Sequence, residues 1–134
     1  MPLIRIDVIE GRSDADIAAI SDVVHQALVS IAGVPARDQF QVITAHAPGR
    51  LVYNPGYLGI DRTDGIVIVQ VFFATGRTEE VKRALYAKIA ADISARTGTR
   101  PQDVFITLSE NTRADWSFGN GVAQYLDLPR EQWR

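Results

Sequence analysis

The first third of the chain changes its hydrophobic period twice, and each change marks a new element. Residues 3–9 place apolar side chains at every second position, which is typical of a half-buried strand. Residues 17–31 then carry apolar side chains at spacings of three and four, which predicts a helix with one buried face. Ser13 suits the N-cap of this helix and Gly33 its end. Residues 40–45 return to a strand pattern.

The same order of patterns returns in the second half of the chain. Residues 66–73 form a nearly continuous apolar run, as expected of a central strand. Thr78 then suits an N-cap, residues 81–93 carry one apolar helix face, and Gly98 ends the helix. Residues 104–108 predict a fourth strand. Each half therefore reads as strand, helix, strand.

The two halves also match each other at a constant offset of 65 positions, which is the separation of Gly11 and Gly76. The same offset pairs, without a gap, Arg12 with Arg77, Ser13 with Thr78, Asp38 with Asp103, and Phe40 with Phe105. An ordered series at one offset indicates an internal duplication. We therefore expect a single domain over residues 1–134, with repeats at about residues 1–47 and 66–112.

This repeat pattern predicts how the strands are arranged. A β-α-β unit makes its two strands parallel, with a right-handed crossover. Two such units related by an approximate two-fold axis place the first and third strands side by side and antiparallel. The predicted fold class is α/β (an α+β sandwich), with a four-stranded mixed sheet and two helices on one face. The other face stays uncovered, and an uncovered apolar face needs a partner, so we expect an oligomer.

The predicted topology brings three reactive side chains to one end of the sheet. Pro2 begins the first strand, Asp38 precedes the parallel second strand, and Arg77 follows the antiparallel third strand. Loss of Met1, for which a Met-Pro start is well suited, leaves Pro2 as a secondary amine whose pKa is lowered by burial or by the Arg77 cation. Such an amine can serve as a base, an acid or a nucleophile. Arg77, beside a helix N-terminus, suits a carboxylate.

Each of these residues also has a purely structural interpretation. Pro2 can simply start an edge strand. Arg77 can be a solvated arginine, which is what we expect of its repeat mate Arg12. Asp38 can be a turn or cap carboxylate, which is what we expect of its mate Asp103. The matching end of the sheet has no terminal proline, so only the Pro2 end can hold a free amine.

Aromatic and histidine residues refine this hypothesis. Trp116 and Phe118 predict the wall of a small apolar pocket, which would strengthen the electrostatic interactions inside it; ordinary packing of this segment on the sheet is the alternative. His25 reads as a helix-face residue, and His46 ends the second strand. Neither histidine has clustered partners, so no metal site is expected.

The composition narrows the class of protein and its partners. Hydrophobic residues make up 46% of the chain, which argues against disorder. The formal net charge is -2, so there is no basic excess for nucleic acid or an anionic membrane surface. The absence of cysteine excludes disulfides and thiolate chemistry. The N-terminus does not read as a secretory signal, and no window approaches the roughly 20 apolar residues of a membrane span. We therefore expect a cytoplasmic protein.

The chain resembles the tautomerase superfamily in four segments: MPLIRIDVIEGR, VPARDQFQ, GRTEE and ADWSFGNG. Within that superfamily it is most similar to malonate semialdehyde decarboxylase and its relatives, from residue 2 to about residue 128. The resemblance implies the fold of macrophage migration inhibitory factor, a homotrimer, and catalysis by an N-terminal proline without a metal or organic cofactor. It implies a small oxo acid as substrate.

The resemblance also assigns residues. It implies catalytic roles for Pro2, Asp38 and Arg77, and substrate contacts from Thr75, Arg77, Trp116, Phe118 and Tyr125. Tyr125 stands where the decarboxylase has a phenylalanine, and Thr75 where it has a first arginine beside the one matched by Arg77. Keto-enol tautomerisation and decarboxylation therefore both stay open. A hydratase or dehalogenase of an unsaturated three-carbon acid and a non-catalytic ligand-binding homologue are the alternatives.

Overall fold

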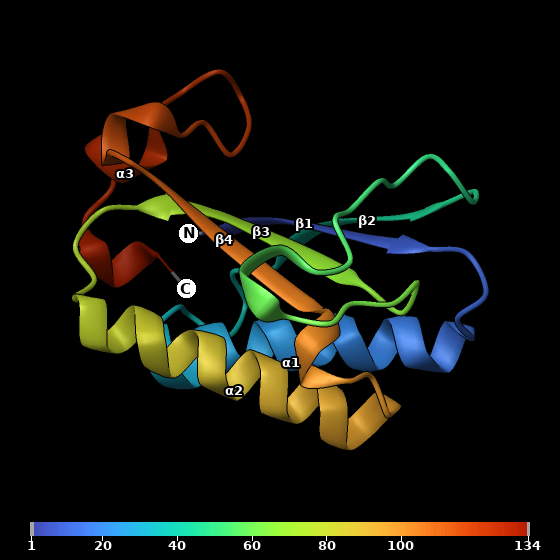
Figure 1. The fold of residues 1–134 in the computed structure, drawn as a ribbon. Coiled ribbons are helices and arrows are strands. Elements are labelled where there is room, and N and C mark those ends of the chain that lie inside the picture. Colours follow the sequence, from blue (N-terminus) through green and yellow to red (C-terminus); the bar gives the residue numbers. More distant parts are fainter. Residues whose placement is uncertain (1, 134) are drawn as a thin grey trace.

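The computed structural model describes residues 2–133 and contains a four-stranded mixed sheet (Figure 1). The strands are β1 (Pro2–Ile9), β2 (Phe40–His46), β3 (Val67–Ala74) and β4 (Val104–Asn111), in the order β2-β1-β3-β4. β1 is parallel to β2, β3 is parallel to β4, and the central strands β1 and β3 are antiparallel. This is the predicted topology, and the predicted strands differ from the observed ones only at their ends.

The two long helices, α1 (Asp14–Ala32) and α2 (Glu79–Thr97), pack side by side on one face of the sheet (Figure 1). Both begin at the predicted hydroxyl caps: the side chain of Ser13 caps α1 and that of Thr78 caps α2. Both end at a glycine in the left-handed region, with φ of 71° at Gly33. The predicted helices and their boundaries are therefore confirmed.

The hydrophobic core lies between the sheet and these helices. Alternate side chains of the central strands and one face of each helix fill it, including Ile4, Ile6, Val69, Val71, Ile20, Val24, Leu85 and Ile89. The opposite face of the sheet is open in the monomer and exposes Leu3, Phe40, Val42 and Phe105. The predicted uncovered apolar face is thus present.

One expectation about α1 needs correction. By length and composition, α1 is apolar enough to cross a membrane, with a mean hydropathy of 1.3 over the tested window. In the fold, one side of α1 packs in the core and its first turn carries Asp14 and Asp16, which is the pattern of a core helix.

The C-terminal tail, residues 112–133, completes the fold. It contains η3 (Arg113–Asp115), α3 (Gln124–Asp127) and η4 (Arg130–Gln132). Figure 1 shows this segment, in orange and red, gathered at the end of the sheet where β1 begins. The long connection before β3 contains only the short turn η1 (Tyr57–Gly59). The tail therefore covers the end of the sheet to which Pro2 belongs.

Candidate active site

Pro2, Asp38 and Arg77 lie at the same end of the sheet. Pro2 is buried and is paired with Phe73 across β1 and β3. The guanidinium carbon of Arg77 lies 4.5 Å from the centroid of the Phe73 ring. Asp38 immediately precedes β2, which pairs with β1 in parallel. The predicted removal of Met1 concerns a residue that lies outside those that the structure describes.

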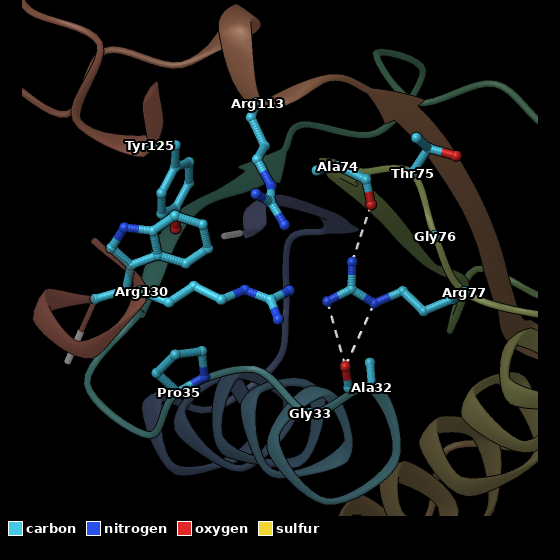
Figure 2. Close-up of a pocket in the computed structure, with 11 residues that line it drawn as sticks. Ala32, Gly33, Pro35, Ala74, Thr75, Gly76, Arg77, Arg113, Tyr125 and Arg130 are labelled. Atoms are coloured by element: carbon cyan, nitrogen blue, oxygen red, sulfur yellow. Dashed lines mark hydrogen bonds between the residues drawn. The ribbon is translucent and has the colours of Figure 1, made fainter. Parts of the chain in front are cut away.

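Backbone carbonyl groups hold Arg77 in place. Its Nε and Nη2 donate to the carbonyl of Ala32 at 3.3 and 3.2 Å, and its Nη1 donates to that of Ala74 at 2.9 Å (Figure 2). A guanidinium has five N–H groups, so two remain for a ligand. Burial lowers the pKa of Arg77, while Glu110 and Tyr125 raise it, and the group stays cationic at neutral pH.

A cavity of about 530 Å³ lies beside Arg77. Its walls are the end of α1, the segment after β3, and four residues of the tail: Arg113, Tyr125, Arg130 and Trp133. Figure 2 shows side chains from these separate segments facing one another across the cavity. A space of this size suits a small organic acid.

Thr75 lies at the rim of this cavity but points its hydroxyl elsewhere. Its amide donates to the carbonyl of Asn111 at 2.8 Å, and in Figure 2 its hydroxyl is directed away from Arg77. The pKa of Glu110 lies below its ordinary value because Lys82 and then Thr75 donate hydrogen bonds to its carboxylate. Thr75 therefore offers the cavity mainly its backbone.

Tyr125 connects Asp38 to the cavity beside Arg77. Its phenol donates to Oδ2 of Asp38 at 3.2 Å. Burial raises the pKa of Tyr125 to about 12, although the Arg77 cation lowers it, so the phenol remains a donor at neutral pH. Asp38 lines a second cavity of about 290 Å³, and both Tyr125 and Trp133 border the two cavities. Asp38 and Arg77 thus line two cavities that share Tyr125 and Trp133 as walls.

The aromatic side chains of the tail form a continuous series. Trp116 stacks on Phe118 at 5.6 Å between ring centroids, Phe118 meets Tyr125 at 4.8 Å, and Tyr125 meets Trp133 at 4.5 Å. Phe118 lines the cavity of Asp38. Trp116 contacts Phe118, and the Nε1 of Trp116 donates a hydrogen bond to Oδ1 of Asn111 at 2.8 Å. The tail therefore supplies an aromatic wall in which Trp116 supports Phe118.

Three charged or aromatic residues of this cavity were not identified from the sequence: Arg113, Arg130 and Trp133. Their segments are short and have no hydrophobic period, so nothing local indicates that they fold back over the sheet. Their cation–π contacts form only when the tail folds over the sheet. The guanidinium carbons of Arg113 and Arg130 lie 5.1 and 5.7 Å from the centroid of the Trp133 ring. The only sequence signal is basic and aromatic residues together near the C-terminus.

Arg12 differs from its predicted surroundings, whereas His25 lies on its helix as predicted. Arg12 is not simply solvated, because it donates to Oγ1 of Thr99 at 2.9 Å and to the carbonyl of Gly65 at 2.5 Å. His25 lies on its helix but is buried, with Nε2 at 2.9 Å from the carbonyl of Ala36, in the loop that leads to Asp38. For Arg12, a loop distant in sequence supplies partners at a position that we expected to be solvated.

Asp103, the repeat mate of Asp38, serves as a turn carboxylate, in agreement with the prediction of a turn or cap role. It is 2% exposed and accepts hydrogen bonds from the backbone N–H and the hydroxyl of Thr63, at 2.7 and 2.6 Å. His46 contacts Asp7, with 2.6 Å between Nε2 and Oδ1. Among residues 2–133, no group of three or more histidine, cysteine, aspartate or glutamate side chains is arranged to hold a metal ion.

Comparison with known proteins places these features in a family. A family model described as "Tautomerase enzyme" matches residues 38–119, and a second model with the same description matches residues 2–59. The probable tautomerase YusQ of Bacillus subtilis (strain 168) is 39% identical over 127 residues, which are 95% of this chain and 100% of that protein.

Solved structures agree with this relation. A malonate semialdehyde decarboxylase inhibited by 3-bromopropiolate is 45% identical, with a TM-score of 0.87 over 93% of this chain and 95% of that one. A second malonate semialdehyde decarboxylase, described in terms of decarboxylase and hydratase activities, is 38% identical, with the same TM-score over 93% and 96%. The fold alone recurs in a symmetric trimer of fused 4-OT, at 24% identity and a TM-score of 0.74 over 90% and 94%.

Proposed function

This chain belongs to the tautomerase family, and we propose that it is an enzyme that uses Pro2 for proton transfer on small oxo acids. The reaction is keto-enol tautomerisation, decarboxylation of a 3-oxo acid such as malonate semialdehyde, or both. One observation carries the proposal: Pro2, Asp38 and Arg77 come from three separate segments to the same end of the sheet, where Arg77 lines a cavity of about 530 Å³ and Asp38 lines a neighbouring one of about 290 Å³. The reaction needs no metal or organic cofactor.

Arg77 binds the carboxylate of the substrate. Its two remaining N–H groups suit a bidentate contact, and its fixed backbone bonds keep the guanidinium oriented before the substrate arrives. Arg77 thereby holds the oxo group and its neighbouring carbon near the N-terminal amine.

Pro2 moves the proton. In tautomerisation the neutral amine takes the proton from the enol oxygen and returns it to the adjacent carbon, which gives the keto acid. In decarboxylation the bond to the carboxyl carbon breaks, the electron pair moves toward the oxo group, and cationic Pro2 stabilises the resulting enolate before protonating its carbon. The two reactions differ in which form of Pro2 begins the cycle.

Asp38 adjusts the charge on Pro2. A carboxylate at the same end of the sheet favours the cationic amine, whereas Arg77 and burial favour the neutral amine. Tyr125 fixes the orientation of Asp38 through its hydrogen bond. Phe118 and Tyr125 exclude water from one side of the site, which strengthens these charge interactions.

Steady-state kinetics with the enol of phenylpyruvate and with malonate semialdehyde test the proposal directly. We expect turnover of at least one of them, and a screen of small oxo acids then ranks the substrates. Turnover of an unsaturated three-carbon acid alone would instead favour the hydratase or dehalogenase reaction, with Asp38 activating water; the hydratase activity named for a related structure motivates that comparison. Binding without turnover of any of these acids would indicate a non-catalytic ligand-binding protein.

Substitution of the two repeat-mate aspartates is expected to separate catalysis from folding. Asp38→Asn removes the charge beside Pro2 and should lower kcat by about tenfold to a thousandfold, with little change in the free energy of unfolding. Asp103→Asn weakens buried hydrogen bonds to Thr63 and should reduce that free energy by about 1–3 kcal/mol, with kcat nearly unchanged. Kinetics and urea unfolding of both variants measure this, and a larger kcat loss in Asp103→Asn would contradict the assignment.

The open face of the sheet is expected to be buried between copies of this chain, most simply in a homotrimer. Leu3, Phe40, Val42 and Phe105 on that face supply the apolar area that drives association. Multi-angle light scattering should give about three times the chain mass of 14.8 kDa at micromolar concentration. A monomer mass under these conditions would contradict the prediction. Cytoplasmic location likewise stays a prediction from the sequence.

A further inference from the structure

The cavity beside Arg77 contains more positive charge than one carboxylate needs. Figure 2 shows the guanidinium groups of Arg113 and Arg130 directed into the cavity from the tail, opposite Arg77. Arg113 opens η3 and Arg130 opens η4, so the two come from separate turns of the tail. No carboxylate is among the described residues that line this cavity.

The two tail arginines are oriented by an aromatic ring instead of by an acidic partner. Their guanidinium carbons lie 5.1 and 5.7 Å from the centroid of Trp133. Within residues 2–133, neither guanidinium makes an ion pair or a hydrogen bond with a carboxylate, whereas Arg96 at the surface pairs with Asp22. Stacking on Trp133 leaves the edges of both guanidinium groups available as donors.

Three cations around one cavity of about 530 Å³ repel one another, and this repulsion is relieved when an anion binds between them. Arg77, held by backbone carbonyl groups, is suited to the carboxylate nearer to the oxo group. Arg113 and Arg130 then remain for a second anionic group on the opposite side. A guanidinium pair matches the planar oxygens of a carboxylate or the oxygens of a phosphate.

We propose that Arg113 and Arg130 form a second anion-binding subsite, and that the preferred substrate is an oxo acid with a second anionic group, a carboxylate or a phosphate, at its far end. The proposal rests on the proposed function for the role of Arg77 and Pro2. It also explains how the site holds an extended acid although Thr75 supplies no cation: the tail brings its arginines from a different part of the chain.

The test compares matched substrates in the assembled, full-length protein. Kinetics are measured with a 2-oxo monocarboxylate, the 2-oxo dicarboxylate of equal chain length, and an analogue with a phosphonate in place of the distal carboxylate. For the wild type, we expect the KM of one of the dianions to be at least about tenfold lower than that of the monocarboxylate, because the dianion gains a charge-assisted contact. The Arg113→Gln/Arg130→Gln double variant should lose this preference, with the KM for the dianions rising to that for the monoanion, whereas Arg96→Gln should keep the preference.

Preference for the carboxylate or for the phosphonate identifies the second group, and either supports the subsite. Equal KM values for the monoanion and both dianions, or a preference that survives in the double variant, would overturn it while leaving Pro2 chemistry intact. If no oxo acid is turned over, titration calorimetry with saturated mono- and dicarboxylates tests the subsite separately. The subsite is supported if the dianion binds at least about tenfold more tightly than the monoanion and if the double variant loses this difference. Equal affinities for the monoanion and the dianion would overturn it.

Discussion

Protein that retains Met1 is expected to have almost no activity on oxo acids. In that form the nitrogen of Pro2 is part of an amide, which is neither basic nor nucleophilic at neutral pH. Loss of a positioned acid–base group removes about 10²–10⁴-fold in rate. Protein expressed with methionine aminopeptidase inhibited should retain Met1, as intact mass spectrometry will show, and its kcat/KM should fall by roughly that factor.

The same sample provides its own control. Treatment with purified methionine aminopeptidase removes Met1 without any change elsewhere, so activity should rise in proportion to the mass fraction that starts at Pro2. The free energy of unfolding should change little, because Pro2 is already paired with Phe73 in the strand ladder. Full activity with Met1 retained would end the proline mechanism.

The sheet and helices could be predicted because their signals are local. Alternation in β1 reports one buried face, and the hydroxyl caps and terminal glycines fix both helices to within a residue or two. The position of Pro2, Asp38 and Arg77 at one end then followed from topology alone, since parallel and antiparallel pairing decide which strand ends meet. No tertiary contact had to be known.

The tail could not be predicted in the same way. Residues 112–133 contain helical turns of three or four residues, and their position depends on contacts between aromatic side chains that belong to different segments of the tail. The sequence therefore does not indicate that Arg113 and Arg130 line a cavity. The surroundings of Arg12 were misjudged for a related reason: its hydrogen-bond partner Gly65 lies in a loop without a sequence period.

Arg77 and Arg12 make a matched pair for testing which end of the sheet is active. Each is anchored through hydrogen bonds to a backbone carbonyl: Arg77 to Ala32 and Ala74, and Arg12 to Gly65. Substitution of either by alanine should therefore reduce the free energy of unfolding by a similar amount, about 1–3 kcal/mol. Stability alone will not distinguish them.

Activity should distinguish them sharply. Arg77→Ala removes a bidentate, charge-assisted contact with the substrate carboxylate, worth about 3 kcal/mol, so kcat/KM should fall roughly a hundredfold. Arg77→Lys should recover part of that loss, since it restores the charge but not the planar pair of donors. Arg12→Ala should leave kcat/KM within about twofold, because its end of the sheet has Val67 where the other has Pro2. Equal losses in the two alanine variants would mean that Arg77 acts through folding alone, and the carboxylate would then have to bind elsewhere.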